Sequence, residues 1–133
     1  MSALYTNNAA TTLAAGITNV ATTLIVSAAT GGLFPSPTGT DYFFITLENS
    51  AGTVREIVKC TARSTDTLTI VRAQDGTTAS SFSSGDKVEL RLVHANLIDF
   101  PLLDEVNTFL KTQTFGNSIV ETSTAMGSTA IDL

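Results

Sequence analysis

The chain of 133 residues has one cysteine, one histidine and no tryptophan. The single cysteine, Cys60, cannot form an intrachain disulfide, and a metal site built from several cysteines is excluded. Any catalytic triad that uses histidine as its base would depend on His94. Nucleophile-elbow, phosphate-loop, His-Glu-x-x-His and dinucleotide-binding motifs are absent from the sequence. We therefore expect no enzymatic activity and no catalytic, cofactor-binding or metal-binding residues.

Charge is also scarce in this sequence. Charged residues make up 14% of the chain, whereas about a quarter is usual in soluble proteins. The 12 acidic and 7 basic side chains give a net charge of -5, which argues against electrostatic binding to nucleic acid or to an anionic membrane. An apolar run of about 18 residues and the cationic start of a signal peptide are both lacking. We expect synthesis in a reducing cytoplasm, and neither nucleic acid nor a membrane as a partner.

Threonine, serine and alanine take the place of the missing charged residues. Threonine is β-branched, and it suits the half-exposed surface of a sheet. Alternating patterns between turn residues predict short strands at 24–27, 41–48, 54–62, 67–73 and 86–92. Residues 9–18 fit either a strand or a helix, and we favour a strand because paired threonines weaken a helix. The expected fold is mainly all-β, a small antiparallel β-sandwich or barrel-like domain.

The parity of apolar residues along these strands predicts the core. Val58, Cys60 and Ala62 share one face, and Ile57 on the opposite face indicates a bulge or a second covered face. Tyr42 and Phe44 fall on the outer face of their strand, where they are candidates for subunit contacts or for second-layer packing. The predicted core consists of Phe43, Ile45, Leu47, Val58, Leu68, Ile70, Val88, Leu90 and Leu92.

Several polar residues adjoin predicted turns. Asp66, Asp75 and Asp86 could form a carboxylate cluster, but aspartate favours turns because its side chain bonds to nearby backbone, and we prefer that interpretation. Gly31 and Gly32 are expected to permit positive φ angles at a turn. Cys60 is expected to act as a small buried apolar residue, and His94 as a structural or surface residue.

Near residue 94 the spacing of apolar residues changes from a strand pattern to a helical one. A helical turn is expected at 94–100, before Pro101, and a helix at 102–111 with an apolar stripe. We divide the chain into a β-rich domain, residues 1–97, and an extension, residues 98–133, made of a linker, a short helix and an extended tail. The stripe, with its flanking phenylalanine, is the predicted oligomerisation surface: Leu103, Val106, Phe109 and Leu110.

Residues 70–91 carry a recognisable pattern. It contains a strand that ends in Arg-x-Gln-x-Gly-Thr-Thr-Ala, then an aromatic residue, Gly-Asp and a final strand. Together with Leu33-Phe34-Pro35 and the opening segment, this pattern resembles the N-terminal domain of tailed-bacteriophage virion appendage proteins, over residues 4–97. Residues 107–115 are similar to segments that introduce the shafts of phage fibres. Within the pattern we expect a structural loop formed by Arg72, Gln74, Gly76, Thr77, Phe82, Gly85 and Asp86.

The resemblance implies a non-enzymatic structural protein of the virion that needs no cofactor. It would be the N-terminal anchor of a tail fibre, docked on other virion proteins through protein–protein contacts. Because phage fibres are generally trimeric, the resemblance also implies a homotrimer. A capsid-decorating or head-fibre protein is an alternative within the same class. A host-surface glycan-binding or hydrolysing module is an alternative from a different class.

Overall fold

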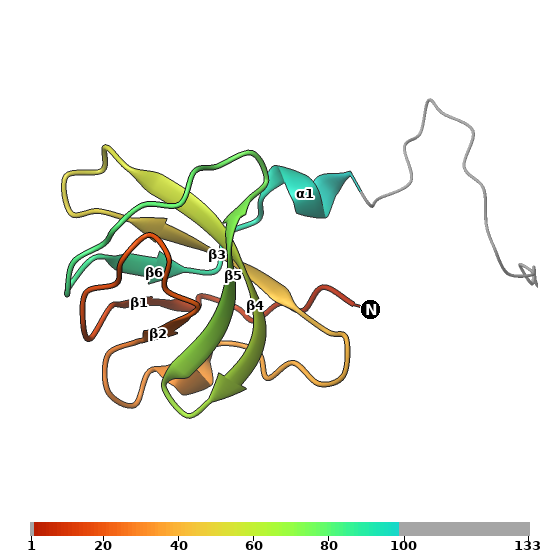
Figure 1. The fold of residues 1–133 in the computed structure, drawn as a ribbon. Coiled ribbons are helices and arrows are strands. Elements are labelled where there is room, and N and C mark those ends of the chain that lie inside the picture. The colour runs from red at the N-terminus through yellow and green to blue at the C-terminus, as the bar shows by residue number, and fades with distance from the viewer. Residues whose placement is uncertain (1, 99–133) are drawn as a thin grey trace, which may run out of the picture. The chain divides into compact units, whose positions relative to one another are not determined.

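The computed structural model describes residues 2–98, and these residues form one antiparallel sheet of six strands (Figure 1). The strands lie in the order β1-β6-β3-β4-β5-β2. The prediction of a mainly β, antiparallel domain is confirmed for this part of the chain. The elements are β1 (Ala10–Thr12), β2 (Thr23–Ile25), the 3-10 helix η1 (Gly31–Leu33), β3 (Phe43–Glu48), β4 (Arg55–Ser64), β5 (Thr67–Gln74), β6 (Lys87–Glu89) and α1 (His94–Leu97).

The sheet curls until its two edge strands meet. An antiparallel bridge between Leu13 and Val26, just beyond the ends of β1 and β2, joins the edges. Beside this bridge the Ser27 amide donates to the Thr12 carbonyl at 2.9 Å. Figure 1 shows β1 and β2 side by side at this point, which we call the seam. The seam gives the domain its barrel-like character.

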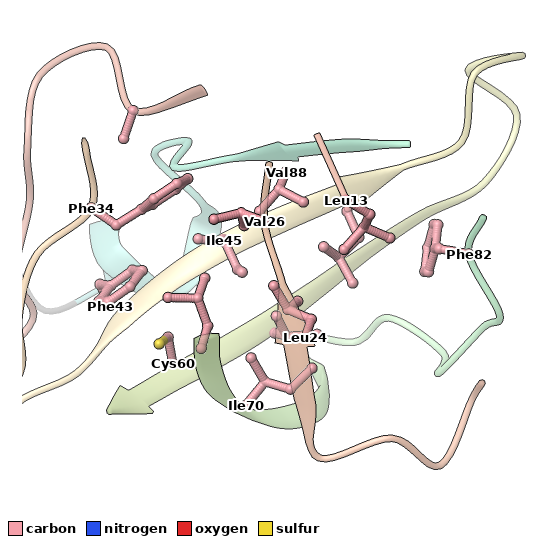
Figure 2. Packing of buried hydrophobic residues seen from close by; sticks show 14 residues of the cluster. Leu13, Leu24, Val26, Phe34, Phe43, Ile45, Cys60, Ile70, Phe82 and Val88 are labelled. Atoms are coloured by element: carbon pink, nitrogen blue, oxygen red, sulfur yellow. The ribbon is translucent and has the colours of Figure 1, made fainter. Parts of the chain in front are cut away.

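The core lies inside the curl (Figure 2). Side chains alternate between the two faces of a strand, so one face of each of the strands β2 to β6 contributes to this cluster, and Ala9 and Leu13 contribute from either side of β1. Phe34 and Phe43 stack at one end, with ring centroids 6.0 Å apart, and Phe82 lies at the other end. Burial of a large apolar side chain stabilises a fold by about 1.5–3 kcal/mol. The predicted core residues that are buried, and so confirmed, are Phe43, Ile45, Leu47, Val58, Leu68, Ile70 and Val88.

The predictions for the last strand need correction. Leu90 is only partly buried against the core, and Leu92 is 62% exposed. The reason is that β6 ends at Glu89, and the last bond between this segment and the N-terminal strand is the one from the Leu90 amide to the Ala9 carbonyl. After that point the chain leaves the sheet, and the period of two no longer determines which side chains are inside.

Strand β4 contains two shifts of register against β5. The first, between Ile57 and Lys59, confirms the irregularity predicted from the position of Ile57. The second falls between Cys60 and Ala62. Ala62 is consequently exposed, although it was predicted to share the inner face with Val58 and Cys60.

The segment predicted at 9–18 is a strand only at Ala10–Thr12, and the helical turn predicted at 94–100 is present as α1. The oligomerisation residues Leu103, Val106, Phe109 and Leu110, and nearly all of the predicted extension, lie outside the described residues. Within residues 2–98, no helix is long and apolar enough to cross a membrane.

Candidate interaction site at the seam of the sheet

The most densely bonded polar group in the described domain is a buried ion pair between Glu56 of β4 and Arg72 of β5. Arg72 donates from Nη2 to Glu56 Oε2 at 2.7 Å and from Nε to Oε1 at 2.9 Å. Glu56 is completely buried. Two parallel bonds between a guanidinium and a carboxylate fix geometry as well as charge, so this pair holds β4 and β5 in one relative position.

The Glu56 carboxylate also accepts two backbone bonds. The amides of Ala73 and Ser80 each donate to it at 3.0 Å. Burial opposes ionisation of Glu56, but the bonds from Arg72, Ala73 and Ser80 outweigh burial and lower the pKa of the carboxyl. Glu56 therefore stays ionised inside the domain.

The remaining donors of Arg72 hold two loops. Nη1 donates to the carbonyls of Thr18 at 2.6 Å and Ala21 at 3.2 Å, and Nη2 donates to the carbonyl of Ser80 at 2.6 Å. The segment 18–21 leads from the end of the seam to β2. The sequence predicted Arg72 as part of a structural loop near the end of β5. The bonds to Thr18 and Ala21 show that Arg72 also holds a loop that is distant in the sequence.

Gln74, Gly76 and Thr77 shape the turn after β5. The Thr77 hydroxyl donates to the Gln74 carbonyl at 2.7 Å and accepts from the Ile57 amide at 3.0 Å. The Gln74 side-chain amide donates to the Arg72 carbonyl at 2.8 Å. Gly76 has a φ of 78°, a left-handed conformation that glycine adopts without strain.

Phe82, Gly85 and Asp86 connect the following loop to the seam. Phe82 is buried and forms a bridge with Ile17, with backbone bonds of 2.8 and 3.0 Å. Gly85 has a φ of 90°, and its amide donates to the Leu13 carbonyl at 2.8 Å. The buried Asp86 carboxylate accepts from the amides of two loop serines, at 2.8 and 3.1 Å.

The three aspartates considered as a possible cluster serve separate loops. Asp66 accepts from the Gly31 amide at 2.8 Å and the Ala29 amide at 3.0 Å, and these bonds lower the pKa of its carboxyl. Asp75 accepts from the Ala95 amide at the start of α1 at 3.0 Å. Within residues 2–98, no group of three histidine, cysteine or acidic side chains could hold a metal ion.

Cys60 and His94 occupy very different environments. Cys60 lies in the core, and burial raises the pKa of its thiol to about 11, so the thiol stays protonated at neutral pH. His94 is exposed at the start of α1, with Nδ1 3.4 Å from Asp75 Oδ1. The Cys60 thiol is therefore not activated, and the His94–Asp75 contact lies at the surface, with the His94 side chain 76% exposed.

Next to the Glu56–Arg72 pair the seam opens. Beyond the Leu13–Val26 bridge, β2 and the segment after β1 separate, and an open hollow of about 350 Å³ lies between them. No charged residue lines this hollow. Its lining consists of Ala15, Gly16, Ile17, Thr18, Ala21, Thr23, Leu24 and Ile25.

The outer face of the sheet carries two further clusters. Tyr42 and Phe44 are half-buried and meet edge to face at 5.4 Å, and the ammonium of Lys59 lies 4.6 Å from the centre of the Tyr42 ring. Near the end of β3, Glu48 is paired with Arg55, Lys87 and Arg91. The bond from Arg55, aided by Arg91 and opposed by burial, lowers the pKa of Glu48 to about 2.

Sequence reasoning found Arg72 but missed Glu56, its partner. Glu56 has the same parity as Val58 and Cys60, and an acidic residue on an inward-facing position is a signal of a buried ion pair. The hollow has no comparable signal, because it depends on where two distant segments separate. Comparison of the chain with protein-family models and with curated proteins gives no match, so the resemblance to phage appendage proteins stays a prediction.

Proposed function

We propose that this chain is a non-enzymatic structural protein of a tailed-bacteriophage particle. Residues 1–97 would act as the N-terminal anchor of a tail fibre or similar appendage, docked on other virion proteins. Residues 98–133 would be the linker, short helix and start of the fibre-like segment. The sequence pattern at residues 70–91 and the low content of charged residues support this proposal. A surface that is covered by neighbours does not need charge to keep the protein soluble.

The observation that carries the proposal is how the motif residues are used. Arg72 donates hydrogen bonds to a buried carboxylate and to three loop carbonyls. The Asp86 carboxylate accepts hydrogen bonds from backbone amides of two loops. Side chains committed in this way rigidify the loops that carry them and are suited to a scaffold that presents a fixed surface to a partner.

A capsid-decorating or head-fibre role is the second candidate of the same class. The Tyr42–Phe44 pair on the outer face favours a contact surface of either kind, because aromatic side chains are enriched in protein interfaces. A glycan-binding module is the alternative from a different class. It would need an open aromatic face, and Lys59 lies over the ring of Tyr42.

The location of the chain on an intact particle tests the proposal. Particles of a phage that encodes this chain would be labelled with a gold-conjugated antibody against it and viewed by electron microscopy. We expect label at the tail or at the base of a fibre. Label spread over the head would favour the decorating role, and purified particles that lack the chain would overturn the proposal.

We also propose that the chain forms a homotrimer through Leu103, Val106, Phe109 and Leu110. An apolar stripe on a short helix needs a partner, because an isolated helix of about ten residues is marginal in water. Sedimentation equilibrium of the full chain should give three times the monomer mass, and the double variant Val106→Asp/Leu110→Asp should sediment as a folded monomer. The control Leu92→Asp, at an exposed site of the described domain, should stay trimeric. A monomeric unmodified chain would contradict the trimer.

A further inference from the structure

The edge of β2 that faces the hollow carries unpaired backbone groups. On its other edge, Thr22 accepts from the Ile70 amide at 2.8 Å, and the Val26 amide donates to Asp66 at 2.9 Å. Successive residues of a strand direct their backbone groups to opposite edges, so those of Thr23 and Ile25 point away from β5. Of these groups, only the Ile25 carbonyl has a partner within residues 2–98, the Ala14 amide at 2.9 Å. The amides of Thr23 and Ile25 and the Thr23 carbonyl are therefore free to pair with another strand.

The opposite wall of the hollow is held away from β2 by its own bonds. Ile17 pairs with Phe82 in both directions, and the Ser84 hydroxyl donates to the Ala14 carbonyl at 3.1 Å. Arg72 binds the carbonyls of Thr18 and Ala21. These bonds make the gap a fixed feature of the fold, and a partner would not have to displace existing strand pairing to enter it.

The uncharged lining of the hollow indicates what kind of segment could bind there. All of the lining side chains are uncharged, and most are small or β-branched. A charged side chain that entered the hollow would lose water without gaining an opposite charge, which is unfavourable. Apolar side chains are exposed at the hollow and in the adjoining loop, where Ile25 is 49% and Val20 76% exposed. Natural edge strands are commonly protected by lysine or proline, and β2 has neither.

We propose that the hollow is a docking groove for an extended, uncharged segment of another protein, which adds as a strand along the free edge of β2. The amides of Thr23 and Ile25 donate to carbonyls of the incoming segment, and the Thr23 carbonyl accepts from one of its amides. Alternate side chains of that segment, small or β-branched, enter the hollow. This inference rests on the proposed function in one respect: the partner is another virion protein.

Amide exchange of the full chain, labelled with nitrogen-15, tests the groove. The probe is the capped peptide Ac-Thr-Val-Thr-Val-Thr-NH2 at millimolar concentration, with Ac-Thr-Asp-Thr-Asp-Thr-NH2 as the charged counterpart. We expect the valine peptide to shift the resonances of Thr23, Ile25 and Gly16 and to slow the exchange of the Thr23 and Ile25 amides several-fold. The aspartate peptide should do neither.

Two substitutions locate the effect. Ala15→Glu places a charge in the lining at an exposed position, so we expect a folded protein that no longer responds to the peptide. Thr40→Glu, at an exposed position outside the lining, should respond like the unmodified chain.

The proposal is overturned if Thr23 and Ile25 do not respond, if both peptides act equally, or if Ala15→Glu responds normally. Such a result, with the chain still located on the phage tail, would reject the groove and leave the proposed function intact.

Discussion

At the scale of single residues, two adjacent glycines have different roles that the sequence does not distinguish. Gly31 and Gly32 were both expected at positive φ, but neither is among the positive-φ residues of the described domain. A Cβ atom on Gly31 would lie 1.9 Å from the Thr65 carbonyl oxygen, whereas a Cβ on Gly32 would meet nothing within 4 Å. Glycine is required at position 31 because the β4–β5 turn comes too close to leave room for a side chain. Position 32 has room for one.

The first prediction follows from this difference. Gly31→Ala should lower the free energy of unfolding by at least the ~1–3 kcal/mol typical of overpacking, because the atom it meets is backbone and cannot rotate away. Gly32→Ala should change it by less than about 0.5 kcal/mol. Urea unfolding of both variants measures the two values. Equal effects would show that η1 can shift away from the β4–β5 turn.

At the scale of elements, the Glu56–Arg72 pair joins two neighbouring strands, β4 and β5, to a loop that follows the seam. It links β4 to β5 directly, and through Arg72 it links both strands to the segment 18–21 that forms one wall of the hollow. The ion pair of Glu48 with Arg55 also joins two neighbouring strands, β3 and β4, but its arginine is at the surface, with the Arg55 side chain 58% exposed. The two arginines, one buried and one exposed, should therefore differ in how much they stabilise the domain.

The second prediction compares these two arginines. Arg72→Met should destabilise the domain by ~3–5 kcal/mol, because it leaves the buried Glu56 charge without its counterion. The matched change Arg55→Met should cost only ~0–1 kcal/mol, because Arg55 is exposed and Glu48 keeps Lys87 and Arg91 as partners. Urea unfolding gives both values. If the two variants were equally stable, the buried pair would not be the link between these elements.

At the scale of the whole molecule, stability should depend on pH through carboxylates that are better stabilised when folded. The pKa of Glu48 is lowered to about 2, and the pKa values of Glu56 and Asp66 are also lowered. A folded pKa below the unfolded value means that the stabilisation is complete above the unfolded pKa. It is lost as pH falls toward the folded pKa.

The third prediction is the resulting acid profile. The urea midpoint should not change through these three groups near neutral pH, and it should fall as the pH decreases from about 5 to about 2. Glu56→Gln should weaken this dependence, because one of the three groups no longer titrates. A midpoint that rose on acidification would mean that these carboxyls bind protons more tightly in the folded state than in the unfolded state.

The sequence by itself determined the fold class and most of the core. Strand periodicity is a local property, so Ile45, Leu47 and Val58 could be assigned to the interior without any knowledge of their neighbours. Turn chemistry was equally local at Gly76, which the sequence placed in a structural loop and which has a positive φ. Where a strand ended early or shifted register, as at Leu92 and Ala62, the same reasoning failed, because pairing with another strand determines those features.

Only the tertiary structure decided how the candidate site is built. Arg72 reaches the carbonyl of Thr18, 54 positions away in the sequence, and Glu56 acquires its counterion only when β4 and β5 pair. The hollow arises because the segment after Leu13 pairs with Phe82 and leaves the β2 edge uncovered. Hydrogen bonds and ion pairs of this kind depend on which segments become neighbours in the fold. The residue pattern of one strand indicates which of its side chains are buried, but it does not indicate which strands lie beside it.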